Sequence, residues 1–361
     1  VTMSDIPKEA LGCVTEMDEA ARKAEFDAFF KTLPEATQIL RSTVPEDSET
    51  WRRAQIIGNE APELEPYRDE PRQFKSAGVG KNGFLRLKMR RDTDGRTIMV
   101  DMERRTPFII LKARCWDEAM PNMRCLYTIT TGGGVLQGDR YAVDLLIEEG
   151  AEAHISTQTA TKIQAMDANY AIQTQTIKVE DNAYFEYMPD LTIPCEHSRY
   201  LTDTRIEMGE NATMLYGEVL VPGRIHHKPE EYFGFDVFSS CVRGYDKQGS
   251  ETFCEKFILE PKRGNIQQLG VMNGFDVFAN VIVLTPKHFA DQIFAQMGVD
   301  YDIKKQLASG LSQLPNDAGL VFKVLGKEVK PVRERIHEFW RVVRKVVKGT
   351  ELPDPFLWRP Y

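Results

Sequence analysis

The amino-acid sequence predicts a mainly β protein whose strands stack in layers, in a β-helical or solenoid-like manner, with helical segments at both ends. From Phe84 onward, apolar residues alternate with charged ones, as Leu85 and Leu87 do with Arg86 and Lys88. A period of two indicates β-strands. The two terminal segments instead carry apolar residues at the spacing of an α-helix, so we expect the helices there.

Composition excludes several classes of protein. The chain of 361 residues is long enough to bury a large core. Its 46 basic and 54 acidic residues give a net charge of −8, which argues against nucleic acid as a partner. Six scattered cysteines without a Cys-x-x-Cys pair are typical of reduced thiols. With no apolar run long enough for a bilayer and no visible secretory signal, we expect a cytoplasmic protein without a membrane partner.

Residues 1–75 are expected to form an acidic, partly helical extension and linker ahead of a β domain that covers 76–361. Ala24, Phe26, Phe29 and other apolar residues recur at near-helical spacing, and a polar stretch with several prolines follows. Such an acidic extension is usually a solvated face, so we assign no chemistry to it.

A weak internal repeat lies inside the β region. Three segments each combine a strand end, an acidic residue, Gly or Asn, and Ala: 147–151, 179–183 and 208–212. Gly150, Asn182 and Asn211, separated by 32 and 29 residues, tolerate the positive φ that tight turns need. Hairpin units at this spacing suggest stacked β layers. Coincidence among ordinary hairpins remains the alternative.

The C-terminal segment predicts an amphipathic helix near 331–348. Its apolar residues fall on one face, and Pro331 and Gly349 stand where a helix begins and ends. The apolar face contains Val332, Ile336, Phe339, Trp340 and Val343. We place Arg344 and the other basic residues largely off this face and expect the helix to pack on the β core.

The usual motifs of catalysis are missing. Residues 78–83 match the letters of GxGxxG, but a polar stretch precedes them and a strand follows, whereas a dinucleotide loop joins a strand to a helix. The sequence has no Walker A loop, no GxSxG elbow and no HExxH motif. We therefore predict that the protein is not an enzyme.

One short cluster resembles a metal site. Cys195, Glu196 and His197 offer a thiolate, a carboxylate and an imidazole, a mixture that nickel or copper accepts. In a strand, Cys195 and His197 would point to the same face. Two ligands are too few for a tight site, so a purely structural role stays open.

Four ordered motifs resemble one known family. Residues 132–140, Gly-Gly-Gly-Val-Leu-Gln-Gly-Asp-Arg, are similar to the GGxxGGDR motif of the UreD (UreH) urease accessory proteins. Residues 157–162 resemble the TTQAATK segment of that family, 185–190 its LEWLPQE segment, and 216–224 its WE…GR pattern. The resemblance covers roughly residues 83–359, with departures inside the motifs at Gln137 and Asp190.

The resemblance implies a non-catalytic metallochaperone scaffold with a mostly β fold of stacked layers. Proteins of this family bind a UreF-type accessory protein, which recruits a UreG-type GTPase, and the assembly docks on apo-urease. A homodimer of heterodimers is one arrangement consistent with this. Nickel is thought to pass through an internal channel, so Ni²⁺ would be transient and no cofactor permanent.

A conduit must hold its ion loosely, because a closed Cys/His cage would trap it. Carboxylates and hydroxyls exchange ligands faster. We therefore expect Asp139, Glu186 and Glu218 to line the path. Cys195 and His197 are further candidates for metal contact.

The other motif residues are expected to serve the fold, with Arg140 and Lys162 pairing with nearby acids. The full set is Gly132, Gly133, Gly138, Arg140, Thr157, Gln158, Lys162, Gly223 and Arg224.

Two alternatives stay open. A β-solenoid enzyme acting on carbohydrate would need an exposed cleft with paired acids and aromatic platforms, and Tyr184, Phe185 and Tyr187 surround Glu186 in sequence. No carbohydrate-enzyme motif accompanies them. The other alternative is a binding scaffold that never contacts metal.

Overall fold

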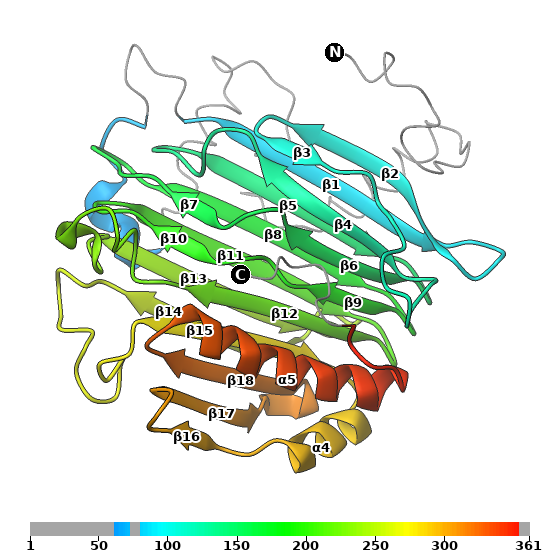
Figure 1. Cartoon of the computed structure of the whole chain (residues 1–361). Helices are drawn as coiled ribbons and strands as arrows, with labels where there is room; N and C mark the ends of the chain where they lie inside the picture. The colour runs from blue at the N-terminus through cyan, green and yellow to red at the C-terminus, as the bar shows by residue number, and fades with distance from the viewer. Residues whose placement is uncertain (1–60, 73–79, 354–361) are drawn as a thin grey trace.

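The computed structural model describes residues 61–72 and 80–353, and its strands form two large mixed β-sheets (Figure 1). The seven-stranded sheet contains, in spatial order, β14 (Glu251–Leu259), β13 (Val237–Tyr245), β11 (Arg199–Met208), β8 (Ala171–Val179), β5 (Arg140–Ile147), β1 (Asn82–Arg91) and β2 (Thr97–Arg105). The eleven-stranded sheet contains β16 (Asp300–Asp302), β17 (Leu307–Gln313), β18 (Gly319–Gly326), β15 (Val277–Leu284), β12 (Thr213–Leu220), β9 (Tyr184–Tyr187), β6 (Glu152–Thr157), β4 (Arg124–Thr130) and β3 (Phe108–Ile110), with β10 (Thr192–Pro194) and β7 (Thr161–Ile163) joined beside β12.

The chain alternates between the two sheets. Strands β5, β8, β11 and β13 run parallel in the seven-stranded sheet, and β4, β6, β9 and β12 run parallel in the other. Gly150, Asn182 and Asn211 occupy the turns that lead from one sheet to the other, with φ of 66°, 58° and 57°. The turns also stack, because Gly150 N–H donates to Asp181 and Asn182 N–H donates to Glu210, each at 2.9 Å. The repeat therefore marks sheet-to-sheet turns rather than hairpins.

The prediction of a mainly β fold with a C-terminal helix is confirmed. The solenoid form of that prediction is not, because both sheets end in antiparallel strands: β2 and β14 in one, and β15 to β18 and β3 in the other. The predicted N-terminal helix and the boundary near residue 75 lie outside the described residues.

The helical elements cover the sheets from outside. They are η3 (Pro62–Tyr67), η4 (Pro229–Glu231), α4 (Lys287–Gln296), η5 (Pro315–Asp317) and α5 (Val329–Lys348). In Figure 1, α5 lies across β15 and β18. The five apolar residues predicted for its inner face are all buried, and the ring of Phe339 stacks on Phe322 of β18 at 4.4 Å. Gly349 ends the helix with φ of 67°. No helix within the described ranges has both the length and the apolar character to cross a membrane.

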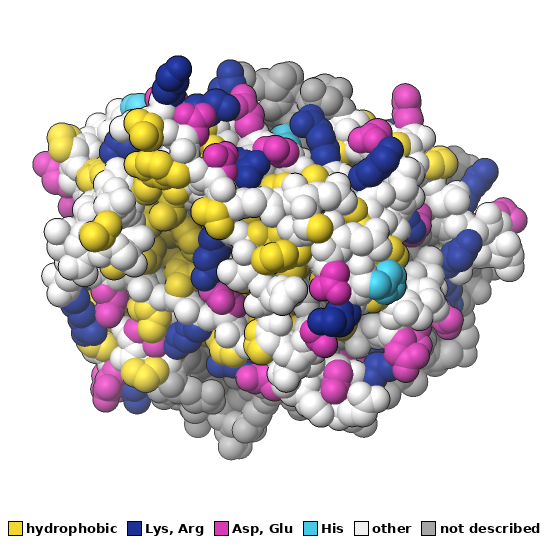
Figure 2. All heavy atoms as spheres, turned by 90° about the horizontal axis from the view of Figure 1, so that it is seen from below, with side chains coloured by type: hydrophobic (Ala, Val, Ile, Leu, Met, Phe, Trp, Pro, Cys, Tyr) yellow, Lys and Arg dark blue, Asp and Glu magenta, His cyan; other side chains and the backbone are white. Residues whose placement is uncertain are grey.

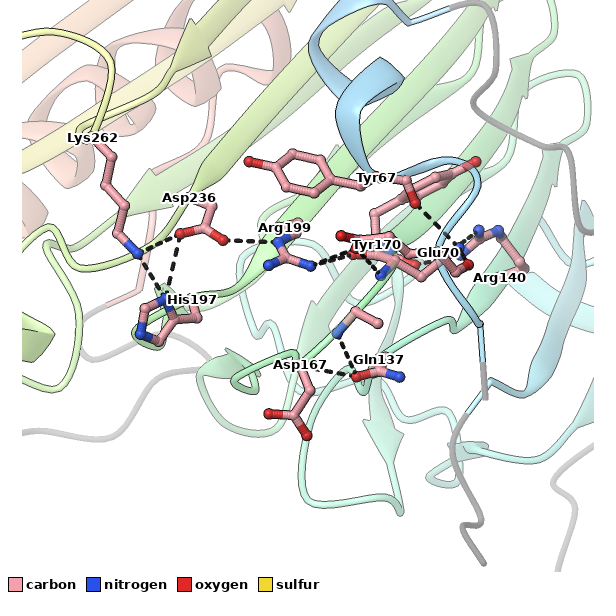
Figure 3. Close-up of polar contacts among 12 residues, drawn as sticks. Tyr67, Glu70, Gln137, Arg140, Asp167, Tyr170, His197, Arg199, Asp236 and Lys262 are labelled. Carbon is pink, nitrogen blue, oxygen red and sulfur yellow. Dashed lines mark hydrogen bonds and ion pairs between the residues drawn. The ribbon is translucent and has the colours of Figure 1, made fainter. Parts of the chain in front are cut away.

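The short segment 61–72 is fastened to the outside of the seven-stranded sheet. Leu64 is fully buried, and the Glu70 carboxylate accepts hydrogen bonds from Asn169 N–H at 2.7 Å and from Arg199 at 3.1 Å. The Arg199 guanidinium also lies over the ring of Tyr67 at 4.3 Å. Figure 3 shows this cluster at the strand ends. The segment that precedes the recognised motifs is thus part of the fold.

The lower end of the molecule in Figure 1 is formed by β16, β17 and α4, and Figure 2 shows apolar side chains gathered on this face. Val299, Tyr301 and Ile303 alternate along the segment of the edge strand β16 and are 86%, 61% and 74% exposed. We call these three residues the edge patch. Apolar groups grouped on an edge strand are typical of a contact surface.

Candidate functional site

A cavity lies between the two sheets. It holds about 100 Å³ of space that water molecules could occupy, and inward side chains of both sheets line it, with apolar residues in the majority. Hydroxyl and amide groups are frequent in this lining, which includes Thr128, Thr130, Thr157, Thr159, Thr161, Thr192, Thr202, Gln173 and Gln175. Its two acidic residues are Asp190 and Glu218. The described lining contains neither cysteine nor histidine.

Glu218 on β12 faces this cavity with a carboxylate whose hydrogen-bonding capacity is not fully satisfied. Its Oε1 accepts hydrogen bonds from Ser240 Oγ at 2.7 Å and Tyr216 Oη at 3.4 Å. Its Oε2 is buried and accepts no hydrogen bond of ordinary geometry, although the Asn280 amide is its cross-strand neighbour. Burial raises the pKa of Glu218, because the charged form loses its hydration.

Other oxygens at the cavity are also unsatisfied. The Gln175 amide donates to Thr204 Oγ1 at 2.9 Å and to Tyr216 Oη at 3.1 Å, but its Oε1 accepts no hydrogen bond from the described residues. The same holds for Thr202 Oγ1. Buried acceptors without a protein donor call for water or an ion.

A second hollow, with about 80 Å³ of space that water molecules could occupy, runs beside α5 and adjoins the cavity. The two spaces share Thr157, Pro189, Asp190 and Val219 in their linings. Asp190 forms an ion pair with Arg333 of α5, and its N–H donates to Thr157 Oγ1 at 2.9 Å. We call this hollow the groove. The ion pair therefore lies where the cavity and the groove meet.

Asp139, the first acid predicted for the path, is not in the lining. The carboxylate is fully buried and accepts hydrogen bonds from the backbone N–H groups of Lys81 and Leu136, each at 2.8 Å, and from the Tyr141 hydroxyl. Burial raises the pKa of Asp139, and these three donors oppose that effect. Through these contacts Asp139 joins the glycine-rich loop to the start of β1.

Glu186, the second acid, holds α5 to the eleven-stranded sheet. Arg344 donates to both carboxylate oxygens at 2.7 and 2.9 Å, and Trp340 Nε1 and Tyr184 Oη donate to Oε1 at 2.8 and 2.7 Å. The His154 ring stacks on Trp340, and its Nδ1 lies 2.9 Å from Oε2. Burial alone would raise the pKa of Glu186, but the Arg344 cation and the hydrogen bonds lower it to about 2.

This burial also bears on the carbohydrate-enzyme alternative. Tyr184 and Phe185 lie inside the protein with Glu186, so they form no exposed platform for a sugar. Glu186 does face a second acid, Asp117, but Arg344 lies between them and pairs with both. The arrangement lacks the exposed cleft with paired acids that glycoside hydrolysis needs.

Cys195, Glu196 and His197 do not form a strand, and the expectation of a shared face was wrong. They occupy the turn between β10 and β11, where Ser198 N–H donates to Cys195 O at 3.1 Å and His197 adopts φ of 59°. The Cys195 thiol is buried, which raises its pKa. The His197 side chain points outward to Lys262 (Figure 3), with 2.7 Å between Nδ1 and Nζ.

The glycine-rich motif makes close backbone crossings. Gly134 and Gly138 have φ of 129° and 72°, and a Cβ at either would lie 2.3 or 2.2 Å from a carbonyl oxygen, of Lys162 and Arg72 respectively. Gly132 and Gly133 sit in the same turn, where a Cβ would meet no such close contact. Gly223 is constrained like Gly138, since its Cβ would lie 2.1 Å from Glu231 O.

The two basic residues of these motifs do not pair with acids as expected. Arg140 is fully buried and donates to Tyr170 O at 2.5 Å, Asp139 O at 3.1 Å and Asn169 Oδ1 at 2.8 Å (Figure 3). Lys162 is exposed and forms no ion pair with a described acid, and its backbone carbonyl makes the contact that matters.

The remaining motif residues also serve contacts of the fold. Arg224 pairs with the buried Glu231, and Gln158 N–H donates to Thr128 O at 3.1 Å. Gln137, which departs from the family motif, accepts hydrogen bonds from Asp167 and Ala168 N–H at 2.9 and 3.1 Å (Figure 3).

Sequence reasoning missed the residue that Glu186 depends on. Arg344 was placed off the apolar face of α5, yet it is fully buried. Its position four residues after Trp340 and eight after Ile336 was the available signal, because residues at these spacings share a helix face. The neighbour of Glu218 on β15, Asn280, was also missed, and its only signal was a polar residue within an apolar strand.

The structure brings Glu218 and Thr157 to one cavity and places Asp139, Glu186, Cys195 and His197 elsewhere. Within residues 61–72 and 80–353, no three His, Cys, Asp or Glu side chains come together in a way that could hold a metal ion. Which residues contact nickel stays a prediction.

Comparison with known proteins agrees with these motifs. Residues 81–359 match the profile of the family described as UreD urease accessory protein. The chain is 48% identical over 307 residues to the urease accessory protein UreD of Yersinia pseudotuberculosis serotype O:1b, covering 85% of this chain and 95% of that relative. It is 46% identical over 311 residues to the UreD of Photorhabdus laumondii (86% and 97%), and 47% identical over 298 residues to UreD 2 of Brucella suis biovar 1 (82% and 98%).

Two mixed sheets that enclose a cavity, with α5 packed against β15 and β18, define a mainly β protein. The matched motifs and the extent of the similarity identify it more closely: the chain belongs to the UreD urease accessory protein family. That membership implies a role in the maturation of urease.

Replacing Arg344 with Leu should destabilise the protein strongly. The variant leaves the carboxylates of Glu186 and Asp117 buried without their cation, and breaking a buried ion pair from one side costs about 3–5 kcal/mol. Urea denaturation of the purified chain measures the loss. Arg341→Leu, on the exposed side of the same helix, is the control and should change the free energy of unfolding much less. Equal stability of the two variants would contradict the structural role of the pair.

Stability should also depend on pH through Glu186. A carboxyl whose pKa is lowered on folding contributes stability above its unfolded pKa, and the contribution is lost as the pH falls toward the folded pKa. For Glu186 the window runs from 4.5 down to about 2. Denaturation midpoints should therefore fall more steeply in this window for the unmodified chain than for Glu186→Gln. Parallel pH profiles would show that the Glu186 carboxylate does not carry the effect.

Proposed function

We propose that this protein is a non-catalytic scaffold that passes nickel to apo-urease through the cavity between its two sheets. It acts with a UreF-type accessory protein, through which a UreG-type GTPase supplies the ion. The observation that carries the proposal is an interior cavity with an unsaturated carboxylate, Glu218, in a chain of the UreD family.

The chemistry of the lining suits transit better than storage. Glu218, Gln175 and Thr202, all in the lining, offer buried oxygen atoms without a close protein donor, and water can complete the coordination of Ni²⁺ beside them. Oxygen ligands in this number hold a borderline cation weakly, whereas thiolate and imidazole ligands would retain it. The ion would therefore exchange from one group to the next.

The groove beside α5 is the route we propose between the cavity and the surface. The Asp190–Arg333 ion pair stands at the junction, so its opening would admit or release the ion. Asp139 and Glu186 are less suited to the path, because hydrogen bonds already occupy both oxygens of each. Cys195 and His197 lie at the turn outside it.

The edge patch supports docking of another protein. Three exposed apolar side chains on an edge strand present both apolar area and unpaired backbone groups, which are the means by which partners add to a sheet. We propose this end of the molecule as a surface for one of the proteins of the urease assembly.

Glu218→Gln should lower the nickel content of urease. The substitution keeps the shape and the hydrogen-bonding oxygen but removes the charge that attracts the cation. The variant is co-expressed with urease and its accessory proteins, and the nickel bound per urease is measured with the urease activity. We expect a several-fold loss of both, with co-purification of the accessory complex unchanged.

The matched control is Glu207→Gln, which removes an acid from β11 that pairs with Lys178 outside the cavity. It should leave nickel loading unchanged. A Thr202→Leu variant is a second test of the passage, because it replaces a cavity hydroxyl with an apolar group. Full nickel loading in both Glu218→Gln and Thr202→Leu, with an intact complex, would refute the proposed passage.

A further inference from the structure

Two free thiols face each other on neighbouring antiparallel strands, outside every motif discussed above. Cys241 lies on β13 and Cys254 on β14, and their Sγ atoms are 3.9 Å apart. Cys241 is buried, whereas Cys254 is exposed. The pair is thus reached from solvent on the Cys254 side.

The pair lies on the face of the seven-stranded sheet that points away from the cavity. Phe238 and Phe257 of the same two strands line the cavity, and each is three residues from its cysteine, so the cysteines point to the opposite face. Ser239 and Lys256 share that outer face, where both contact Glu63 of η3. The thiols are therefore separate from the proposed nickel path.

The register does not favour a disulfide. Cys241 stands opposite Lys256, and Cys254 stands opposite Arg243, so the two cysteines are diagonal neighbours. Diagonal positions on antiparallel strands are about 7–8 Å apart, beyond the usual Cα separation of a disulfide. The thiols would have to move to form an S–S bond.

The sulfur separation does suit a shared metal ion. Two thiolates that bind one tetrahedral Zn²⁺ with metal–sulfur bonds of about 2.3 Å lie about 3.8 Å apart, close to the 3.9 Å observed. Burial raises the pKa of the Cys241 thiol to about 12, and the Arg243 cation, which pairs with Asp203 at 2.7 Å, opposes that effect only in part. A bound metal ion therefore has to displace the Cys241 proton.

We propose that Cys241 and Cys254 form a two-thiolate site for a thiophilic cation that takes tetrahedral coordination, such as Zn²⁺ or Cd²⁺, on the outer face of the seven-stranded sheet. Binding breaks the two S–H bonds, forms two metal–sulfur bonds and releases two protons to solvent. With two protein ligands, solvent completes the coordination, so the ion exchanges more readily than in a closed four-ligand site.

Cadmium is the probe that tests the site, because its thiolate complexes absorb in the ultraviolet. The reduced full-length chain is titrated with Cd²⁺, and absorbance, calorimetric affinity and proton release are recorded. We expect saturation at one ion per chain for this pair. Cys254→Ser should abolish the charge-transfer band and weaken the affinity by at least about tenfold, since one of two ligands is lost. Cys254 is exposed, so this variant should fold normally, as a thermal melt will verify.

The matched control is the double variant Cys13→Ser/Cys115→Ser, which removes two other thiols and keeps the pair. It should bind Cd²⁺ as the unmodified chain does. The proposal fails if Cys254→Ser retains the band and the affinity, or if the control loses them. It also fails if the chain purified without reductant carries a Cys241–Cys254 disulfide that excess Cd²⁺ does not open. Nickel loading of urease by Cys254→Ser should stay normal, which separates this site from the proposed passage.

Discussion

The buried ion pair between Glu186 and Arg344 is the interaction on which the rest of the structure depends. It joins the middle of the eleven-stranded sheet to α5, and both side chains are fully inaccessible. A buried pair adds little net stability compared with apolar residues, but it allows only one geometry, because any other placement of the helix strands a charge. The pair therefore sets where α5 lies. Since Arg333 belongs to the same helix, it also sets where the Asp190–Arg333 pair meets the cavity.

The alternation of the chain between two sheets explains why a cavity exists at all. Each strand turns one face to the other sheet, and along most of its length that face is apolar and packs as core. Around Gln175, Thr202 and Glu218, polar side chains occupy the inward positions instead. They cannot interdigitate as branched apolar side chains do, and several leave acceptors unsatisfied. Apolar residues at these positions would avoid the cost of burying polar groups without partners.

Much of the fold followed from local patterns, because they reflect local physics. The period of two predicted the strands, and Gly150, Asn182 and Asn211 predicted the turns. The apolar pattern of α5 predicted its inner face, and the predicted start of the helix differs by two residues from the observed one. The site did not follow. Asp139, Glu186 and Glu218 look alike in sequence, and only the groups around each decide its role, which come from segments as distant as residues 81, 240 and 344. The prediction for Cys195 and His197 was wrong for another reason, because the chain forms a turn there, with His197 in the left-handed region, instead of the expected strand.

The two buried glutamates have different environments within the same protein interior. Glu186 is saturated by donors and a cation, which lower its pKa, whereas burial raises the pKa of Glu218, whose second oxygen lacks a proper donor. A saturated carboxylate cannot accept a passing cation without first breaking its own contacts. An unsaturated one gains a partner when a cation arrives, and it loses little when the ion leaves because a proton or water can replace it. The direction of the pKa shift alone does not separate the two environments, because burial also raises the pKa of Asp139, whose oxygens both accept hydrogen bonds. An oxygen without a close donor is what distinguishes Glu218 on the proposed path.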